Sequence, residues 1–288
     1  IVIGGGPAGA TAAAVLAEKG RRVAVLEKER FPRYHIGESL MPYCYYTFER
    51  LGVLEKLQAS HFPKKYSVQF VSTEGLVSAP FYFYQHLKHE AAVTWQVLRS
   101  EFDQMLLDNA REKGAKVIEE ISVKKLIWKE KRVVGVRTVT KNGAEEEFLA
   151  PLTFDATGKE AFAATRNGWR ERDPYLNKVA VWTYYTGAIR QEGIDGGATG
   201  VAFVPEKGWF WWIPLHNDRL SLGIVAEGKY LSRDGVRDPK VMLEREINNN
   251  QWIKDNLAPA KQYGDYYVTN ELSLIHISEP TRPRLISY

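Results

Sequence analysis

The chain opens with a glycine spacing suited to holding a phosphate group. It begins IVIGGGPAGA, in which Gly4, Gly6 and Gly9 form the pattern G-x-G-x-x-G directly after a short β-branched run. In such a motif the first glycine permits a tight turn, the second lets the backbone approach a pyrophosphate, and the third lets a helix pack closely on a strand. The N–H groups at the start of that helix, around Pro7 and Ala8, face the phosphates. The motif therefore predicts a dinucleotide site.

An acidic residue stands where a dinucleotide site uses one. An Ala-rich helix is predicted from Ala8 to Lys19, and a second apolar strand, Val23–Leu26, ends at Glu27. A carboxylate about 20 residues beyond the glycines accepts hydrogen bonds from a ribose hydroxyl. This arrangement of strand, glycine turn, helix, strand and acid distinguishes the motif from an ordinary glycine-rich turn.

The polar loop that follows, residues 28–40, is rich in hydrogen-bond donors and comes directly after the ribose position. Lys28, Arg33 and Ser39 are therefore candidates for contacts to the dinucleotide. The alternative is a solvated connector in which Ser39 caps a helix predicted from Met41 to Leu57.

Further elements alternate between two kinds of pattern. Alternating and aromatic residues predict strands of a second sheet, and apolar residues at helical spacing predict a helix before the chain returns to short apolar strands. The strand at 152–158 ends in a small-residue turn containing Asp155 and Gly158, a second place where backbone can approach the dinucleotide. The predicted elements are strands at 65–72, 79–84, 92–98 and 115–118, a helix at 99–113, a hairpin within 122–140 and a strand at 147–149.

The stretch from residue 178 to 225 has long alternating strands dense in aromatic residues. This pattern predicts an antiparallel sheet with one face too aromatic to be left in water, which should roof a pocket. A helix is predicted over 239–256. The fold class is therefore α/β, a Rossmann-like dinucleotide-binding domain with an interleaved antiparallel β-sheet region.

Composition excludes several classes of protein. The chain has 288 residues, 44% of them hydrophobic, and its net charge of +4 is spread without a basic run that would suggest nucleic acid. A single cysteine, Cys44, excludes an internal disulfide and a cysteine-based metal cluster, so no metal site is predicted and a cytoplasmic location is expected. No apolar run approaches the ~18 residues of a membrane span, and no secretory leader is predicted.

Both ends have unusual features. The first residue already belongs to a buried strand pattern, so a few preceding residues are expected to be missing. Residues 272–282 and 286–288 can be back-translated into segments that resemble a transposase sequencing adapter. We therefore expect 272–288 to be a non-native tail and exclude it from the fold. The alternative is a natural disordered tail.

Several motifs together resemble a known group. Gly4 to Gly9 with Glu27, FPRxxIGESL at 31–40, RSxFD at 99–103 and DATG at 155–158 are similar to motifs of FAD-dependent monooxygenases of the p-hydroxybenzoate hydroxylase type. Within that superfamily, W-x-W-x-I-P at 209–214 and F-x-x-K-x-S-x-x-F at 62–70, where Ser67 replaces the family's glycine, resemble motifs of flavin-dependent halogenases. The resemblance spans residues 1–271, with segments 62–98 and 178–230 as the inserted substrate sheet.

The resemblance implies a role for each matched residue. Lys65 takes the place of the lysine essential to halogenation. Trp209 and Trp211 line a tunnel between flavin and substrate, with Ile213 and Pro214 completing that motif. The residues implied to bind FAD are Gly4, Gly6, Pro7, Ala8, Gly9, Glu27, Lys28, Arg33, Ser39, Arg99, Asp155 and Gly158.

The resemblance also implies the chemistry. Reduced FAD from a separate flavin reductase reacts with oxygen and with chloride or bromide, and hypohalous acid then reaches Lys65. The lysine holds or carries the electrophilic halogen, and an electron-rich aromatic or pyrrolic substrate, free or tethered to a carrier protein, accepts it. The implied enzyme is an FAD-dependent oxidoreductase.

Other interpretations of the same residues remain open. Lys65 beside Lys64 is also typical of solvated surface charge, and closely spaced tryptophans are typical of sheet packing. An FAD-dependent hydroxylase or a geranylgeranyl-reductase-like oxidoreductase shares every FAD motif. Two family segments expected after Glu271 do not occur in this sequence. We therefore expect weak FAD binding and little or no turnover by the chain itself, and a non-catalytic FAD-binding fragment is a third alternative.

Overall fold

The structure of the 288-residue chain is a computed structural model, and it describes residues 1–171, 177–205 and 208–270. The tail at 272–288, predicted to be non-native, lies outside these described residues.

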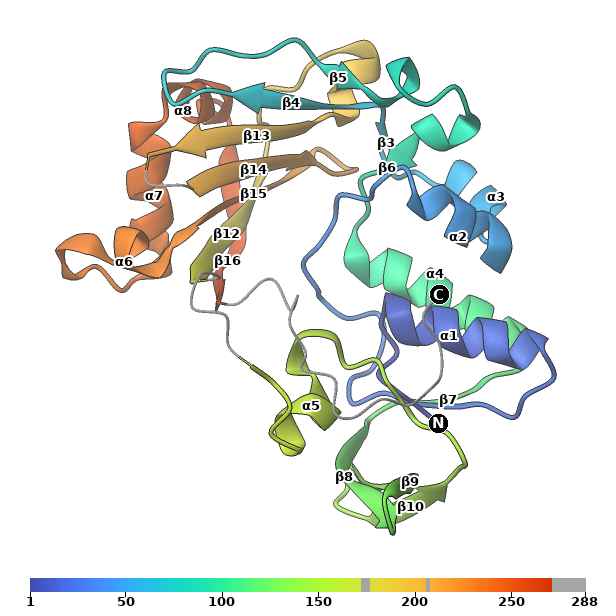
Figure 1. Cartoon of the computed structure of the whole chain (residues 1–288). Coiled ribbons are helices and arrows are strands. Elements are labelled where there is room, and N and C mark those ends of the chain that lie inside the picture. The colour runs from blue at the N-terminus through green and yellow to red at the C-terminus, as the bar shows by residue number, and fades with distance from the viewer. Residues whose placement is uncertain (172–176, 206–207, 271–288) are drawn as a thin grey trace. The chain divides into compact units, whose positions relative to one another are not determined.

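The chain divides into two compact units, each built from two stretches of sequence (Figure 1). The first unit holds the described residues of Ile1–Ile36 and Arg99–Asp173. The second holds those of Gly37–Leu98 and Pro174–Leu272. The chain therefore leaves the first unit twice.

Four short parallel strands form the central sheet of the first unit. β1 (Val2–Ile3) lies between β2 (Ala24–Leu26) and β11 (Phe154–Asp155), and β7 (Lys116–Ile118) pairs with the far side of β2. The chain adds strands on one side of β1 and later on the other. In open α/β sheets, ligands bind outside the carboxyl ends of the strands at such a switch point.

Helices α1 (Pro7–Glu18) and α4 (Arg99–Glu112) pack against each other in this unit. Both begin and end within one residue of their predicted bounds. A Cβ on Gly9 would lie 1.9 Å from the Gly4 carbonyl oxygen, far inside van der Waals contact. Only glycine therefore lets α1 start so close to the turn after β1.

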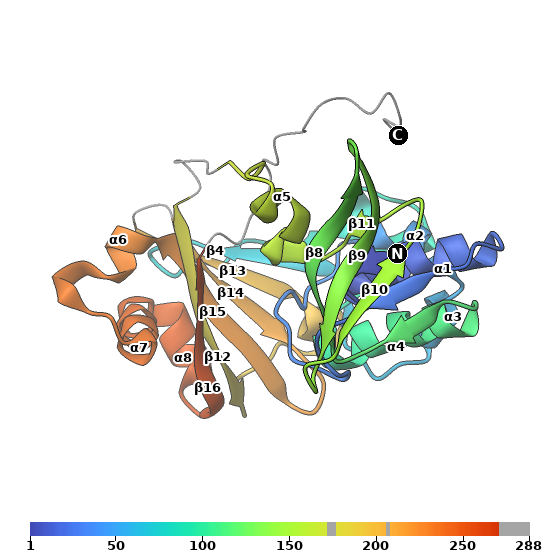
Figure 2. The same cartoon turned by 90° about the horizontal axis from the view of Figure 1, so that it is seen from below.

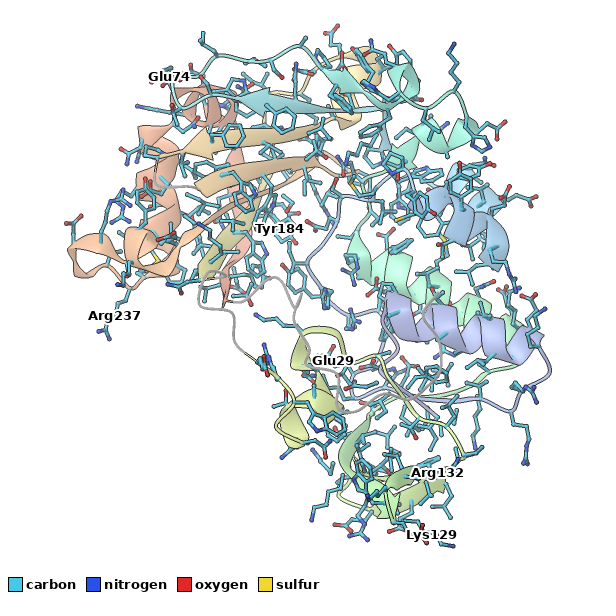
Figure 3. The ribbon with its side chains drawn as sticks, in the orientation of Figure 1. Glu29, Glu74, Lys129, Arg132, Tyr184 and Arg237 are labelled. Carbon is cyan, nitrogen blue, oxygen red and sulfur yellow. The ribbon has the colours of Figure 1, made fainter. Side chains whose placement is uncertain are left out.

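A three-stranded antiparallel sheet completes the first unit, and its strands β8 and β9 form the predicted hairpin. Figure 3 labels Lys129 and Arg132, which flank the turn of this hairpin. Buried residues of the hairpin pack with Ile3 and Leu26 of the parallel sheet. The strands are β8 (Ile121–Lys129), β9 (Arg132–Thr140) and β10 (Glu145–Leu149), and the helix α5 (Phe162–Arg166) follows β11.

A seven-stranded sheet dominates the second unit (Figure 2). Four of its strands were predicted between residues 178 and 225, and they pair antiparallel as expected. The pair of β4 with β13 is parallel, so the whole sheet is mixed. In spatial order the strands are β16 (Lys261–Asn270), β12 (Lys178–Thr186), β15 (Arg219–Glu227), β14 (Gly208–Pro214), β13 (Thr199–Val204), β4 (Ser67–Val71) and β5 (Phe81–Tyr82).

The two faces of this sheet have different surroundings. One face packs against α7 (Pro239–Asn249) and α8 (Gln251–Leu257) through a core that includes Phe210 and Leu222. Because side chains alternate along a strand, the residues next to Phe210 and Leu222 on their own strands point to the opposite face. A short antiparallel pair, β3 (Lys64–Lys65) with β6 (Thr94–Trp95), belongs to the same unit.

Two predicted long helices are each divided in the structure. The helix predicted at 41–57 becomes α2 (Cys44–Leu51) and α3 (Leu54–Gln58), because Gly52 adopts a left-handed conformation with φ +70°. The helix predicted at 239–256 is interrupted at Asn250, whose side chain accepts the Ile253 N–H at 3.0 Å and starts α8. A capping residue inside an apolar periodic pattern can therefore end one helix and begin another.

Other boundaries were also wrong. The strand predicted at 79–84 shrinks to β5, because Phe83–Gln85 forms a 3-10 turn. The strand β16 was not predicted at all. None of the helices in the described residues is both apolar enough and long enough to span a bilayer.

The contact at Gly9 leads to a test of stability. We expect Gly9→Ala to destabilise the chain by about 2 kcal/mol or more, because the added methyl group overlaps the Gly4 carbonyl. Chemical denaturation of the cofactor-free chain measures the change. Gly6→Ala is the matched control, since a Cβ there would meet only the Arg33 Nη2 atom at an ordinary 3.4 Å. Equal stabilities for the two variants would contradict this account.

Candidate functional site

A cavity of about 570 Å³ lies in the first unit at the carboxyl ends of its parallel strands. Gly4 follows β1, Glu27 follows β2 and Ala156 follows β11, and all three line the cavity. The predicted cofactor residues Gly6, Pro7, Ala8, Lys28, Arg33, Arg99 and Gly158 line it as well.

The glycines of the opening turn have separate reasons for lacking a side chain. Gly4 has φ +100°, and a Cβ there would lie 2.6 Å from the Ala156 carbonyl oxygen. Gly6 has φ −66°, which any residue adopts, and a Cβ would have ordinary room. Because Gly6 lines the cavity and the fold does not require its small size, close approach of a ligand to its backbone explains it.

The start of α1 offers backbone donors to an anion. Its N-cap, Gly6, supplies no side-chain hydrogen bond, Pro7 follows it, and the first turn carries no acidic residue. The positive end of the helix dipole and its N–H groups together favour a phosphate there.

Glu27 is buried at the edge of the cavity, and both of its carboxylate oxygens are engaged. Oε2 accepts the Gly5 N–H at 2.6 Å, and Oε1 accepts the Glu29 N–H at 2.8 Å. Glu27 therefore joins the glycine turn to the loop after β2. Each carboxylate oxygen has a second lone pair, so these contacts leave capacity for a ribose hydroxyl.

Two arginines of the cavity share one buried carboxylate. Asp103, fully buried on α4, accepts from Arg99 Nε at 2.7 Å and Nη2 at 2.9 Å, and from Arg33 Nη1 at 2.9 Å. Arg99 Nη1 also donates to the Ile36 carbonyl at 2.5 Å. Bidentate pairing fixes the planes of guanidinium groups. Burial lowers the pKa of the neighbouring His35, and the two arginines lower it further.

The remaining predicted cofactor residues of this unit have other partners. Lys28 forms an exposed ion pair with Glu160. Asp155 accepts hydrogen bonds from the backbone N–H groups of Thr157 and Ala163, so it shapes the turn beside the cavity without lining it. Gly9 likewise acts through packing. Ser39 belongs to the second unit.

The cavity lining carries an excess of positive charge, because six Lys or Arg side chains face three Glu side chains. This balance suits a ligand with two phosphate groups. The cations are Lys28, Arg33, Arg99, Lys124, Lys159 and Arg166, and the acids are Glu27, Glu29 and Glu160.

In the second unit, Lys65 is almost completely buried, with 2% of its surface exposed. The interpretation as solvated surface charge is therefore wrong for Lys65, although the neighbouring Lys64 is exposed. Lys65 Nζ donates to Ser39 Oγ at 2.9 Å and to the Leu40 carbonyl at 3.2 Å. Burial lowers its pKa from 10.5 to about 8, with a small opposing effect from Cys44.

The sheet face opposite α7 and α8 carries an aromatic cluster formed by Trp182, Tyr184, Trp211 and Tyr267. Trp182 stacks on Tyr267 with ring centroids 5.4 Å apart and lies 6.1 Å from Trp211. Figure 3 shows Tyr184 on this face, and its hydroxyl donates to the buried Glu38 carboxylate at 2.9 Å.

The predicted tunnel residues divide between the two faces. Trp209 is 37% exposed, Trp211 is half-buried, and alternation places Ile213 on their face. Pro214 pairs with Leu220, a member of the helix-covered core, and so lies on the other face. On their own face these tryptophans are thus partly accessible.

Gly223 makes room for the Trp211 indole. A Cβ on Gly223 would lie 2.3 Å from Trp211 Cζ2 and 2.4 Å from the Trp182 Cβ. The indole Nε1 donates to Ser221 Oγ at 3.1 Å. The orientation of Trp211 is therefore determined by the neighbouring strand.

Comparison with known protein families supports a dinucleotide ligand for the cavity of the first unit. The sequence profile of the FAD binding domain family matches residues 1–172. The chain belongs to this FAD-binding family.

The chain is also similar to flavin-dependent halogenases. It is 37% identical over 255 residues to the flavin-dependent halogenase armH3 of Armillaria mellea, covering 86% of this chain and 49% of that protein. It is 30% identical to the 1H-pyrrole-2-carbonyl-[peptidyl-carrier protein] chlorinase of Pseudomonas fluorescens, covering 92% and 65%. The structure of the myxobacterial chondrochloren halogenase matches with a TM-score of 0.86 and 32% identity, covering 94% and 63%. The chain spans about half the length of armH3.

Three residues of the RSxFD and DATG motifs received no predicted role, and the structure places them beside residues that did. Asp103 orients two predicted FAD residues, and Ala156 and Thr157 line the cavity. The signal for Asp103 was its place four residues after Arg99 on one helix, a spacing that brings two side chains together. Strand alternation within 178–186 would have placed Trp182 and Tyr184 on the same face.

Because the fold has room for a Cβ at Gly6, a substitution there tests FAD binding separately from folding. We expect Gly6→Ala to weaken FAD binding by about 10-fold or more, because the methyl group keeps the pyrophosphate from the backbone. Fluorescence titration of the cofactor-free chain with FAD measures this. The unfolding temperature of Gly6→Ala should differ from that of the native chain by no more than about 2 °C. Unchanged FAD affinity in a folded variant would contradict the assigned approach.

Burial of Lys65 predicts how stability depends on pH. Because its pKa is about 8 in the folded chain and 10.5 in the unfolded chain, the unfolded state binds more protons between these pH values. The free energy of unfolding therefore rises with pH across this window, by about 3 kcal/mol from this group. Lys65→Met should remove that rise, and Lys64→Met, at the exposed neighbour, should retain it. Denaturation at pH 7.5 and pH 10 tests this, and parallel curves for the native chain and Lys65→Met would contradict it.

Proposed function

We propose that this chain supplies the flavin-binding and halogen-transfer parts of an FAD-dependent halogenase. The observation that carries the proposal is Lys65, a buried amine with a pKa lowered to about 8, in a chain that also has an FAD-family cavity. An amine that gains its neutral form near physiological pH is a nucleophile for an electrophilic halogen. Similarity to several flavin-dependent halogenases supports this assignment.

In this proposal each predicted residue of the first unit has a task toward FAD. The donors around Gly6 and the start of α1 receive the pyrophosphate, and Glu27 receives a ribose hydroxyl. Arg33 and Arg99, fixed by Asp103, add positive charge. Pro7, Ala8, Lys28 and Gly158 complete the walls, while Gly9 and Asp155 act by holding the turns.

Bound reduced FAD would supply hypohalous acid from oxygen and chloride or bromide. The uncharged Lys65 nitrogen attacks the halogen: an N–halogen bond forms, the halogen–oxygen bond breaks, and the leaving hydroxide takes an amine proton as water. A ring carbon of the substrate then attacks the halogen. The N–halogen electron pair returns to nitrogen, which accepts the proton lost from the ring. Burial of Lys65 keeps water from consuming the intermediate.

The substrate we propose is an electron-rich aromatic or pyrrolic ring, with Trp209, Trp211 and Ile213 on the face that guides the halogen and with Pro214 supporting the strand. The similarity to a chlorinase and a brominase whose names specify a pyrrole on a peptidyl carrier supports a tethered substrate as one form. We also propose a separate flavin reductase as a partner. The single cysteine supports a cytoplasmic location.

The test is halogen transfer by a full-length protein that contains this chain, with FAD, a flavin reductase, oxygen, bromide and a panel of phenols and pyrroles. We expect brominated product from that protein and a loss of about 100-fold or more with Lys65→Ala, because no amine remains to transfer the halogen. Lys64→Ala is the matched control and should retain the native rate.

Three results would count against the proposal. Hydroxylated product without bromine would favour the hydroxylase alternative. Bound FAD without any product would leave a flavin-binding chain only. Equal bromination by Lys65→Ala and the native chain would remove the role of Lys65.

A further inference from the structure

Two hydroxyl groups connect Lys65 to a buried amide. Lys65 Nζ lies 2.9 Å from Ser39 Oγ, which lies 2.8 Å from Thr199 Oγ1. Gln96 Nε2 donates to Thr199 Oγ1 at 2.8 Å and to the Gly197 carbonyl at 2.9 Å. Gln96 is fully buried and Thr199 nearly so. These groups form one continuous chain of hydrogen bonds.

The direction of this chain follows from its buried end. A carbonyl oxygen can only accept, so the Gly197 contact requires the Gln96 amide to present its NH₂ group there. The same NH₂ group donates its second proton to Thr199 Oγ1. Among the described residues, Ser39 Oγ is the acceptor that remains within hydrogen-bond distance of the Thr199 hydroxyl. The donors therefore run from Gln96 to Thr199 to Ser39.

This direction distinguishes the two protonation states of Lys65. With an uncharged amine, Ser39 accepts from Thr199 and donates its own proton to the Lys65 lone pair, while an amine N–H donates to the Leu40 carbonyl. With an ammonium, Ser39 must accept from both Lys65 and Thr199. Its own proton then has no acceptor among these partners. A hydroxyl without an acceptor costs free energy in a buried site, so the network favours the amine.

The elements packed around Lys65 carry little charge that would stabilise its ammonium form. Of the titratable groups around Lys65, Cys44 at the start of α2 acts on it and raises its pKa slightly. The carboxylate of Asp195, in the 3-10 segment Gly193–Gly197, accepts instead from Tyr82 and Ser67. Glu38 accepts from Tyr184. The Phe83 ring lies 5.4 Å from Lys65 Nζ.

Backbone contacts hold the segments that carry this network next to one another. Ser39 and Gln96 form an antiparallel bridge, and the Leu40 N–H donates to the Trp95 carbonyl at 3.1 Å. A Cβ on Gly197 would lie 2.0 Å from the Lys64 carbonyl oxygen, so only glycine lets that segment pass so close to β3. The segments that carry Lys65, Ser39 and Thr199 are therefore joined directly to one another.

We propose that Ser39 and Thr199 are positioning residues that direct a hydroxyl donor at the Lys65 nitrogen and thereby favour its uncharged, nucleophilic form. This rests on the proposed halogen-transfer role of Lys65 and deepens it. It also gives Ser39, predicted from sequence as an FAD contact, a direct partner in the second unit. The Thr199 side chain acts on Lys65 only through Ser39.

The test measures the titration of Lys65 directly. Lysine labelled with ¹³C at Cε is followed by NMR from pH 6 to pH 11, and the Lys65 signal is assigned by its loss in Lys65→Met. We expect Thr199→Val to raise the midpoint by about half a pH unit, because Ser39 becomes a better acceptor for the ammonium. We expect Ser39→Ala to raise the midpoint as well, because the uncharged amine loses the hydroxyl that donates to it.

Two matched variants control for general effects of substitution. Thr199→Ser keeps the hydroxyl and should restore the native midpoint. Thr183→Val removes a buried hydroxyl elsewhere in the same sheet, which donates to the Asp265 carbonyl, and should leave the Lys65 midpoint unchanged.

Upward shifts of the midpoint in both Thr199→Val and Ser39→Ala would support the relay. An unchanged or lowered midpoint in either folded variant, or a shift in Thr183→Val of equal size, would overturn it. Because this readout needs no turnover, it is separate from the bromination test. If Lys65 titrates as expected but no brominated product forms, the relay is supported and the proposed function is not. If bromination occurs but the substitutions leave the Lys65 midpoint unchanged, the proposed function is supported and the relay is not.

Discussion

The close approach of backbone to backbone at the start of the chain is the constraint on which the first unit depends. Gly9 lies against the Gly4 carbonyl, and Gly4 lies against the Ala156 carbonyl, so β1, α1 and the turn after β11 converge where any side chain would separate them. This convergence places the start of α1 at the switch point of the sheet. A site for two phosphates follows from it, because main-chain donors and the helix dipole then point into one cavity.

The arginines around that cavity show how charge is held beside a ligand site. Arg33 and Arg99 come from distant parts of the sequence, and the buried Asp103 orients both. A carboxylate with no exposed surface is tolerated because two guanidinium groups neutralise it and satisfy its oxygens. The remaining positive charge of the lining is available to the pyrophosphate of FAD.

The main constraint in the second unit is different, because this unit buries the amine of Lys65. Desolvation disfavours the ammonium of Lys65, and in the proposed relay the Ser39 hydroxyl, which lies between Thr199 and Lys65, donates to the uncharged nitrogen. The same unit carries an aromatic face whose indoles are oriented by their neighbours, as Gly223 and Ser221 do for Trp211. The proposed halogen transfer needs both features, a nucleophile that is not protonated and an aromatic face whose side chains are fixed.

Local patterns in the sequence determined the glycine turn, the helices α1 and α4, the strand pairs of 178–225 and the family motifs, because each depends on neighbours a few residues apart. Sequence patterns did not determine the breaks at Gly52 and Asn250 or the strand β16, where capping and pairing compete with periodicity. Only the tertiary structure decided that Lys65 is buried, that Ser39 meets it and that Thr199 continues the chain. These residues are far apart in sequence, and hydrogen bonds between them exist only once the sheet and its connecting segments have packed.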